Sequence, residues 1–288
     1  MRRFALATLV LLAVSCDVYD FPGMVWSKSP TSDERFAESV DYFEAHPIQT
    51  FLSLANNYRV YVATDAHVDK SSPTLARFVS DFRSDNHLDR APFALYLGDT
   101  GHAKGDIDSF YKEVQPLLSN RRDTLFCTAG NHDLYFGQWS DWTAKFHTSS
   151  YYFEVLTLLG ERDLYICLDS GNGTLGKLQR DWVEKVLASR GPGARQIVVF
   201  THTHFFKKDG SQGHTSNYTL EETYDIADLF AEYGVDLVLT GHDHFREDTV
   251  FKGVRYVIVD AIEAAAEESW YDIINIGDTI SVSFVQVQ

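Results

Sequence analysis

Short apolar runs alternate along the chain with stretches in which apolar residues recur every three or four positions. The runs are rich in β-branched and aromatic residues and do not alternate strictly with polar ones, which is typical of strands covered on both faces. They predict strands over residues 58–63, 93–97, 124–127, 164–168, 196–200, 235–239 and 254–259. The amphipathic stretches predict helices over residues 75–82, 109–118, 178–188 and 220–233. This alternation predicts a layered α/β domain.

The segment before the first strand has a different pattern. Two arginines precede an apolar run at residues 4–14, and Ser15 and Cys16 follow it, as in an export signal. The run has 11 residues, whereas a membrane-spanning helix needs roughly 20. We therefore predict that residues 1–15 are a signal peptide that is removed.

Cys16 follows Ala-Val-Ser, which resembles a bacterial lipobox, in which the cysteine carries the lipid. Ala13 is a weaker match than the usual leucine, so plain secretion is the alternative. Either route predicts an exported protein, periplasmic or at the cell surface, that meets the membrane only through a lipid at Cys16. We predict that residues 16–57 are a tether and packing arm, with a helix over 31–45 capped by Ser32, and that residues 58–288 are one folded domain.

Composition narrows the classes of function. The chain has 288 residues, of which 44% are hydrophobic, and this supports a sizeable core and excludes intrinsic disorder. It carries 25 basic and 41 acidic residues, a formal charge of −16, so a role as a nucleic-acid scaffold is not expected. Three cysteines exclude a disulfide framework, and Cys127 and Cys167 lie in apolar runs as small core residues.

Five predicted strands run into Asp, His or Asn residues. The segments that follow them are Thr64-Asp65-Ala66-His67, Gly98-Asp99-Thr100-Gly101-His102, Gly130-Asn131-His132-Asp133, Thr201-His202-Thr203-His204 and Gly241-His242-Asp243-His244. Ligands collect at the carboxyl ends of strands in open α/β sheets. Two Asp-x-His or His-x-His pairs on extended segments would each project to one face.

Oxygen and imidazole donors without thiolates suit Mn, Fe, Zn or Ni and not a closed structural zinc site. Two such pairs and a bridging carboxylate fit two metal ions that hold a water or hydroxide between them. The order of the five motifs, from Asp65 to His244, resembles the calcineurin-like metallophosphoesterases. That resemblance implies a four-layer α-β-β-α sandwich of two facing mixed sheets flanked by helices.

The resemblance also implies roles for individual residues. It assigns one ion to Asp65, His67 and His244, the second to Asn131, His202 and His242, and a bridging position to Asp99. His202 is preferred to His204 because the family places its ligand as the first histidine after the strand. His132 would not bind metal but would contact the phosphate or give a proton to the leaving oxygen, while a metal-bridging hydroxide attacks phosphorus.

One position departs from the family pattern. Three residues past the bridging aspartate, relatives carry an aspartate that pairs with the catalytic histidine or, in purple acid phosphatases, a metal-binding tyrosine; here the residue is His102. The purple acid subtype is therefore disfavoured. We predict that Asn131, His132 and His102 contact substrate, with Asp133 or Asp169 as candidate partners of His132.

These observations predict a metal-dependent hydrolase of a small phosphoester, with His132 and Asp99 as catalytic residues. Preference for monoesters or diesters stays open, and a non-catalytic surface lipoprotein is the other alternative. Lys207, Lys208 and His214 follow His202 in a polar loop and either contact substrate or face water.

Overall fold

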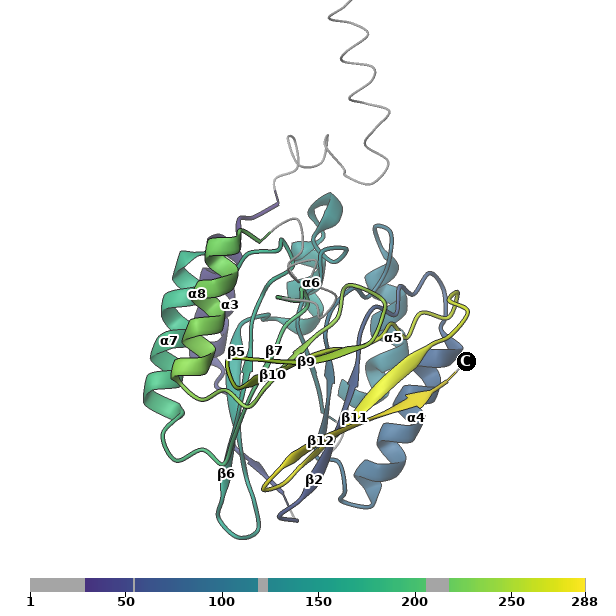
Figure 1. Cartoon of the computed structure of the whole chain (residues 1–288). Helices are drawn as coiled ribbons and strands as arrows, with labels where there is room; N and C mark the ends of the chain where they lie inside the picture. The colour runs from purple at the N-terminus through teal and green to yellow at the C-terminus, as the bar shows by residue number, and fades with distance from the viewer. Residues whose placement is uncertain (1–28, 54, 119–123, 206–217, 288) are drawn as a thin grey trace, which may run out of the picture.

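The computed structural model describes residues 29–53, 55–118, 124–205 and 218–287, and in these residues two mixed sheets face each other (Figure 1). The five-stranded sheet has the order β12-β11-β2-β3-β4, and the seven-stranded sheet has the order β1-β5-β6-β7-β8-β10-β9. The strands of the first sheet are β2 (Tyr58–Ala63), β3 (Phe93–Tyr96), β4 (Leu125–Cys127), β11 (Trp270–Ile276) and β12 (Ile280–Gln286). Those of the second are β1 (Phe51–Leu52), β5 (Tyr151–Leu156), β6 (Arg162–Cys167), β7 (Gln196–Phe200), β8 (Leu237–Thr240), β9 (Glu247–Phe251) and β10 (Val254–Ile258).

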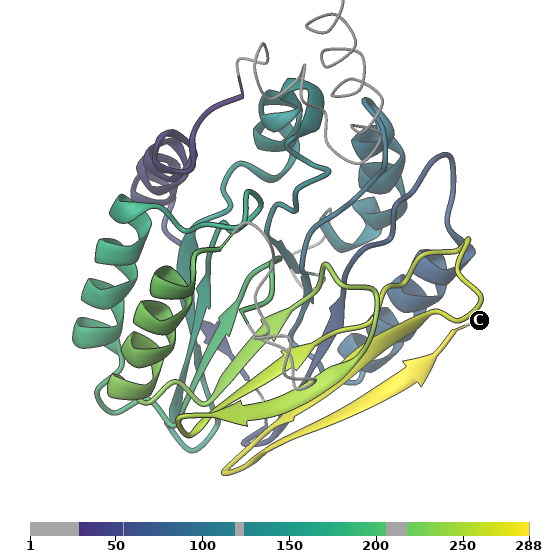
Figure 2. The same ribbon diagram turned by 45° about the horizontal axis from the view of Figure 1, so that its top comes forward.

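Helices cover the outer face of each sheet (Figure 2). Three lie on the seven-stranded side, namely α3 (Ser32–Ala45), α7 (Lys177–Arg190) and α8 (Leu220–Glu232). Others lie on the five-stranded side, namely α4 (Pro73–His87), α5 (Asp106–Leu118) and α6 (Trp139–Phe146), with the short 3-10 helix η1 (Tyr135–Gly137) before α6. The four-layer α-β-β-α prediction is confirmed.

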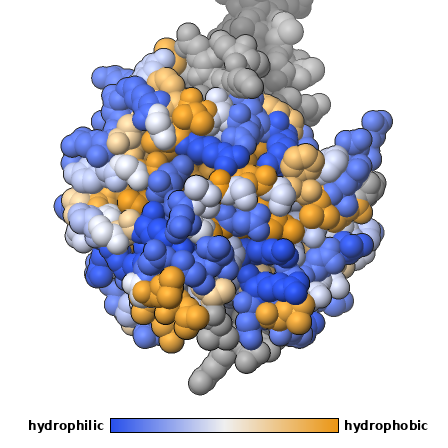
Figure 3. Space-filling view, turned by 60° about the horizontal axis from the view of Figure 1, so that its bottom comes forward, coloured by the Kyte–Doolittle hydropathy of each residue, from blue (hydrophilic) through white to orange (hydrophobic). Residues whose placement is uncertain are grey.

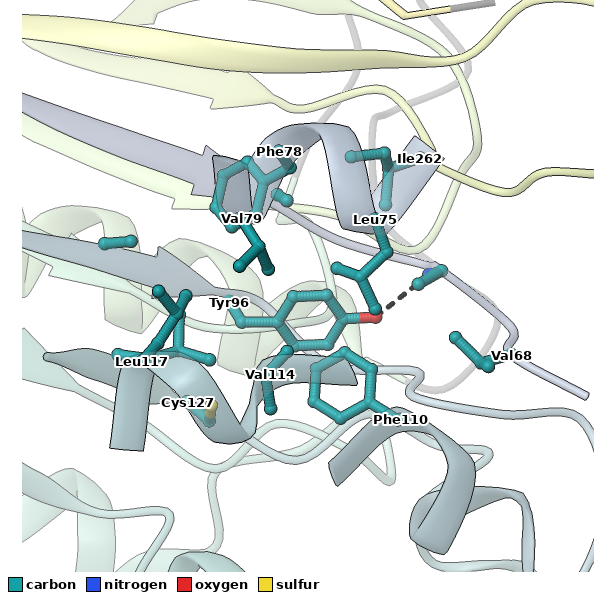
Figure 4. Close-up of a cluster of buried hydrophobic side chains, with 14 of the residues drawn as sticks. Val68, Leu75, Phe78, Val79, Tyr96, Phe110, Val114, Leu117, Cys127 and Ile262 are labelled. Carbon is teal, nitrogen blue, oxygen red and sulfur yellow. Dashed lines mark hydrogen bonds between the residues drawn. The ribbon is translucent and has the colours of Figure 1, made fainter. Parts of the chain in front are cut away.

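Three groups of buried apolar side chains fill the spaces between the layers. One lies between the two sheets and includes Val62, Leu95 and Phe200. The other two lie between a sheet and its helices, and Figure 4 shows part of the group under α4 and α5. Because both faces of the central strands are buried, their sequences are nearly continuous apolar runs.

Tyr96 connects this core to the ends of the strands. Its ring is fully buried, and its hydroxyl accepts from Ala66 N at 2.9 Å (Figure 4). The same hydroxyl donates to Asp99 O at 3.0 Å. The core side chain therefore holds the main chain of two neighbouring loops in place.

Several elements were missed or misplaced by the sequence pattern. Strands β1, β5, β9, β11 and β12 and helix α6 were not predicted. In β9 and β12 polar and apolar residues are mixed because these strands form sheet edges and are partly open to water. The helix over 31–45 is present, but its cap is Thr31 and not Ser32: Thr31 accepts from Glu34 N, and Glu34 accepts from Thr31 N.

The surface shown in Figure 3 is mostly hydrophilic, with small separate hydrophobic groups, as expected for an acidic chain. No helix in the described residues is long and apolar enough to cross a membrane. The predicted signal peptide and Cys16 lie outside the described residues, so these predictions stay untested. Cys127 and Cys167 are free and buried, as predicted.

Candidate metal centre

The carboxyl ends of five strands bring the predicted residues together. Strands β2, β3 and β4 carry Asp65, Asp99 and Asn131 from the five-stranded sheet, and β7 and β8 carry His202 and His242 from the other. The carboxyl ends of parallel strands lie on the same side of a sheet. Here the carboxyl ends of the strands in both sheets lie close together.

The first of two groups of donor atoms, the inner cluster, consists of Asn131, His202 and His242. His202 Nε2 lies 2.9 Å from Asn131 Oδ1 and 3.1 Å from His242 Nδ1, and the last two atoms are 2.9 Å apart. His202 is fully buried, and its Nδ1 faces Leu97 O at 2.8 Å. That contact assigns the proton to Nδ1 and leaves Nε2 available as a ligand.

The second group, the outer cluster, consists of Asp65, His67 and His244. The two Nε2 atoms of His67 and His244 are 3.1 Å apart, and Asp65 Oδ1 lies 3.9 Å and 3.4 Å from them respectively. The other carboxylate oxygen, Asp65 Oδ2, accepts from Thr64 Oγ1 and from His242 N. One oxygen is thus tied to the protein while the other faces the imidazoles.

Asp99 lies between the two clusters. Its Oδ1 accepts from His132 N at 2.8 Å, and its Oδ2 lies 3.5 Å from His202 Nε2 and 3.9 Å from His67 Nε2. The side chain is almost fully buried. A single carboxylate oxygen is therefore within 4 Å of an imidazole in each cluster.

These donor sets fit divalent metal ions. Donor atoms bound at right angles to one ion, each at about 2.1 Å, lie about 3.0 Å apart. The inner-cluster separations of 2.9 to 3.1 Å match that spacing, and so does the 3.1 Å between the outer imidazoles. Asp65 Oδ1 is also buried without a hydrogen-bonding partner among the described residues. A cation would satisfy these converging lone pairs.

The backbone near the donors is not extended, so the predicted geometry of the Asp-x-His and His-x-His pairs is wrong. Asp65, His67, Asp99, His242 and His244 all have positive φ, between 42° and 77°. Left-handed conformations cost roughly 1–2 kcal/mol for residues other than glycine. The packing of the fold holds this strain at the donor positions, which is typical of functional sites.

Glycines in the motifs permit close approach of the loops. A Cβ on Gly98 would lie 2.6 Å from Gly130 N and 2.8 Å from His202 Nδ1. A Cβ on Gly241 would lie 2.1 Å from Thr64 Oγ1. Side chains at these two positions would push the strand ends apart, which explains the glycines before Asp99 and His242.

Burial and neighbouring charge shift the ionisation of the donors. Burial raises the pKa of Asp99 well above its ordinary value, and the carboxylates of Asp65 and Asp133 raise it further. Burial also lowers the pKa values of His67 and His242 to about 3, which keeps both imidazoles neutral. Neutral imidazoles are the form that binds metal, whereas the raised pKa of Asp99 means that this carboxyl group must lose a proton when an ion binds.

Asp65 and His244 behave differently. Burial opposes ionisation of Asp65, but its contact with His244 and the nearby imidazole of His202 bring its pKa below the ordinary value. The same contact with Asp65 raises the pKa of His244 to about 8. In the metal-free protein, His244 is thus the outer donor that carries a proton near neutral pH.

His132 belongs to neither cluster, but one of its ring nitrogens lies within 4.8 Å of donor nitrogens of His67 and His102. Its ring centroid is 4.9 Å from that of His67, and burial lowers the pKa of its imidazole. Both predicted partners are wrong. The Asp133 carboxylate accepts from the main-chain N–H groups of Asp99, Thr100 and Gly130, and Asp169 forms a buried pair with Arg35 at 2.8 Å. The nearest acceptor to His132 Nδ1 is the carbonyl of His102 at 3.5 Å.

His102 and His204 complete the predicted set. The His102 ring stacks on that of His67, with centroids 4.0 Å apart, and its Nε2 lies 3.1 Å from Glu263 Oε1. His204 is buried and faces Asp243 at 3.3 Å, outside both clusters. Lys207, Lys208 and His214 lie outside the described residues.

Two residues near the donors were missed by sequence reasoning. Tyr135 Oη accepts from Asn131 Nδ2 at 2.9 Å, and Glu263 contacts His102 and faces His244. Tyr135 lies four residues after Asn131 in the Gly-Asn-His-Asp segment, so proximity in sequence was an available signal. Glu263 lies in a loop without a motif, and no sequence signal pointed to it.

Solved structures with the same fold share little sequence with this chain. A dimetal phosphatase from Danio rerio matches with a TM-score of 0.62 and 10% identity, covering 80% of this chain and 98% of its own. GAP50 of Plasmodium, the anchor in the inner membrane complex, matches with a TM-score of 0.60 and 14% identity, covering 80% and 84%. A purple acid phosphatase from yellow lupin (Lupinus luteus) seeds has a TM-score of 0.61 and 14% identity, covering 81% and 52%.

A search of curated proteins gave no match. The family model for the calcineurin-like phosphoesterases matches residues 58–246, more than half of the chain, and this range contains every residue of the two clusters and Asp99. The chain belongs to the calcineurin-like phosphoesterase family.

Proposed function

We propose that this protein hydrolyses phosphate esters at a centre of two divalent metal ions. The observation that carries the proposal is the position of Asp99 Oδ2, 3.5 Å from His202 Nε2 and 3.9 Å from His67 Nε2. A carboxylate oxygen shared by two sets of imidazole donors is the arrangement that places two cations side by side.

The inner and outer clusters would hold one ion each, and Asp99 would contact both. Bound ions of this kind supply Lewis-acid activation of water and of the phosphoryl oxygens. The donors accept Mn, Fe, Zn or Ni. Asp65, Asp99 and the main-chain contacts that hold them fix the donor positions before substrate arrives.

The protein residues that would act on the substrate are Asn131, His132 and His102. The main-chain N–H of His132 donates to Asp99 Oδ1, which holds the backbone of this residue beside the shared carboxylate. From there His132 would pass a proton to the leaving oxygen, a contribution of about 10²–10⁴-fold in rate. His102 lies on the far side of His67 and is half exposed, where a phosphoryl oxygen or ester group can reach it.

The test is hydrolysis of aryl phosphate monoesters and diesters by protein loaded with Mn, Zn, Fe or Ni. Asp99→Ala should abolish turnover, and His132→Ala should lower kcat by about 10²–10⁴-fold while both ions stay bound. His87→Ala, an exposed histidine at the end of α4, is the matched control and should behave as wild type. Absence of turnover of both esters by protein with two bound ions would contradict the proposal, as would full activity in Asp99→Ala.

The same assay addresses the type of ester. The proposed substrate is a small phosphoester, and the ratio of kcat/KM for the diester and the monoester shows which is preferred. Binding of esters without turnover would instead favour a non-catalytic role for the fold.

We also propose that the protein is exported and attached by a lipid at Cys16. The support is the sequence pattern of residues 1–16 alone. Mass spectrometry of the mature N-terminus tests it: a diacylglyceryl group on Cys16 is expected, whereas an unmodified Cys16 or a different first residue would exclude the anchor.

A further inference from the structure

Glu263, in the loop between β10 and β11, faces two histidines from different strand ends. Its Oε1 lies 3.1 Å from His102 Nε2, and its Oε2 lies 3.7 Å from His244 Nδ1. The carboxylate side chain is only 18% exposed. One negatively charged group therefore lies behind the outer cluster, on the side away from Asp65.

His102 connects Glu263 to His67, the second imidazole of the outer cluster. The His102 ring is almost parallel to that of His67, with an interplanar angle of 8° and centroids 4.0 Å apart. Glu263 thus contacts one neighbour of His67 and faces His244 itself. The inner cluster is supported differently, because His202 Nδ1 faces a main-chain carbonyl, that of Leu97, at 2.8 Å.

The main chain around Glu263 is held by the fold. Ile262 N donates to Thr64 O at 3.0 Å, and Ile262 O accepts from Thr74 Oγ1. The carbonyl of Glu263 accepts from Ser269 Oγ and from Ala266 N. Because Thr64 directly precedes Asp65, the same contacts that fix the Glu263 loop also place it against the outer cluster.

The chemistry of such a contact is well defined. His244 Nε2 faces Asp65 and His67, so Nδ1 is the nitrogen left for an outer partner. A metal-binding imidazole that gives its other N–H to a carboxylate keeps one tautomer and becomes a stronger donor. Loss of such a partner typically weakens metal binding by about 10–100-fold.

We propose that Glu263 is a positioning residue for the outer cluster, which it supports through the charge that it presents to His244 Nδ1 and through its contact with His102, whose ring stacks on His67. This inference rests on the proposed two-ion site. It explains why this chain has a histidine at position 102, where relatives carry aspartate or tyrosine. The His102 side chain does not pair with His132; it contacts Glu263 and stacks on the ligand His67.

The experiment is a metal titration of the metal-free full chain by calorimetry, with Mn²⁺ and Zn²⁺ alone. Glu263→Gln keeps the shape of the side chain and removes its charge, and should weaken one of the two ions by about 10–100-fold while the other binds as in wild type. His102→Ala should weaken the same ion by a smaller factor. Glu268→Gln, an exposed residue of the same loop, is the control and should leave both affinities unchanged.

The outcomes separate this inference from the proposed function, because metal binding is measured without turnover. Unchanged binding in Glu263→Gln, or equal weakening of both ions, would overturn the inference. In an activity assay, saturating metal should restore kcat of Glu263→Gln, since its role is to hold the ion. A loss of kcat that saturating metal does not restore would also overturn it. Thermal unfolding of the metal-free variants should match wild type, so a fold defect is detected separately.

A second, independent observation concerns Tyr135 and Phe136 of η1, at the rim of the centre. The Tyr135 ring lies 4.9 Å from that of His132, and the two aromatic rings of η1 have centroids 6.4 Å apart. Tyr135 is 37% exposed and Phe136 is 50% exposed. An apolar surface therefore adjoins the residue that would protonate the leaving group.

The backbone of Phe136 is strained. Its φ of 58° and ψ of 22° lie in the left-handed region, which bulky residues rarely adopt. The turn is fixed on its far side, because the buried Gln138 accepts from Gly105 N and donates to His132 O. An exposed aromatic residue kept in a strained conformation beside a site indicates a function for the ring.

We infer that the rings of Tyr135 and Phe136 bind a flat, apolar leaving group of the phosphoester, which again rests on the proposed function. Aryl esters belong to this class, whereas glycerol and other polyol esters do not. Stacking on an exposed ring would favour an aromatic ligand by about three- to tenfold.

The test compares binding of phenylphosphonate and methylphosphonate, which are not hydrolysed, to the metal-loaded protein. Wild type should bind phenylphosphonate more tightly, and Phe136→Gly should lose most of that preference. Because glycine adopts a left-handed backbone at no steric cost, Phe136→Gly should not destabilise the fold. Phe284→Gly, an exposed residue of β12, removes a ring elsewhere and should keep the preference. An equal preference in wild type and Phe136→Gly would overturn the inference, even if the enzyme hydrolyses phosphoesters.

Discussion

The inner and outer clusters use similar donors but are held very differently by the fold. Inner donor His202 has no exposed surface, and its second nitrogen meets the Leu97 carbonyl at hydrogen-bonding distance. Outer donor His244 is 39% exposed, and its second nitrogen is 3.7 Å from Glu263. The donors of each cluster come from both sheets, so the difference lies in the contacts of these imidazoles and not in the packing of the two sheets.

This difference indicates that His202 is held rigidly and that His244 is the more adjustable donor. A preorganised set of donors loses little conformational entropy when an ion binds, so the inner ion should be held more tightly. An ion held by the outer cluster would be bound in part by the partly exposed His244, whose Nδ1 is 3.7 Å from Glu263, and should exchange more readily. Asp99 couples the two halves because its Oδ2 faces both.

The largest expected effect comes from removing one imidazole at a time. His202→Ala should weaken binding of the inner ion, and His244→Ala should weaken binding of the outer ion. Each loss of affinity should exceed the roughly 100-fold that removal of a hydrogen-bonding partner of a ligand costs. Equilibrium dialysis with elemental analysis should then show tighter binding of the ion that remains in His244→Ala than of the ion that remains in His202→Ala. Equal or reversed affinities would remove the distinction between the clusters.

The donors of both clusters were predictable from sequence because each follows an apolar run and carries a glycine or a second donor nearby. Gly98 and Gly241 are required by close contacts with neighbouring loops, so these glycines in the motifs indicate where the loops approach one another. The central strands were predictable for a similar reason, since burial on both faces demands continuous apolar residues.

The features of the site that were not predicted depend on tertiary contacts, which leave no pattern in the local sequence. Glu263 contacts His102, which is 161 positions away in sequence, and its own loop is unremarkable in composition. Asp133 seemed a partner for His132, but its carboxylate accepts from three main-chain N–H groups and cannot also face the histidine. The left-handed backbone at the donors was likewise invisible, because it results from how the strand ends pack together.

The pH dependence of metal binding should separate the clusters by about 100-fold. In the metal-free protein the pKa of His244 is about 8, so an ion must displace its proton at lower pH, whereas His242, with a pKa of about 3, is already neutral. Deprotonation of the shared Asp99 affects both ions alike, so below pH 8 the affinity for the outer ion should fall about tenfold per unit more steeply than that for the inner ion. Competition titrations at pH 6, 7 and 8 measure this; parallel curves for both ions would contradict it.

The stability of the metal-free protein should show the same contrast. His202→Ala leaves the buried Leu97 carbonyl without its partner and should cost about 1–3 kcal/mol of unfolding free energy. His244→Ala should cost less than about 0.5 kcal/mol at pH 9. That pH is chosen because the stability from the raised pKa of His244 is present below pH 6.5 and is lost as pH rises through about 8. Urea denaturation checks both values, and equal costs would contradict the contrast.

The smallest effect concerns the orientation of a single amide in the inner cluster. Tyr135 Oη accepts from Asn131 Nδ2, which turns Asn131 Oδ1 toward His202 and His242. Tyr135→Phe keeps the ring and removes only this acceptor, so the inner ion should bind up to about tenfold more weakly while the outer ion is unaffected. Tyr224→Phe, an exposed tyrosine on α8, is the matched control. If Tyr135→Phe weakened the outer ion instead, the rigid half of the centre would not depend on this contact, and the two clusters would be less independent than their geometry indicates.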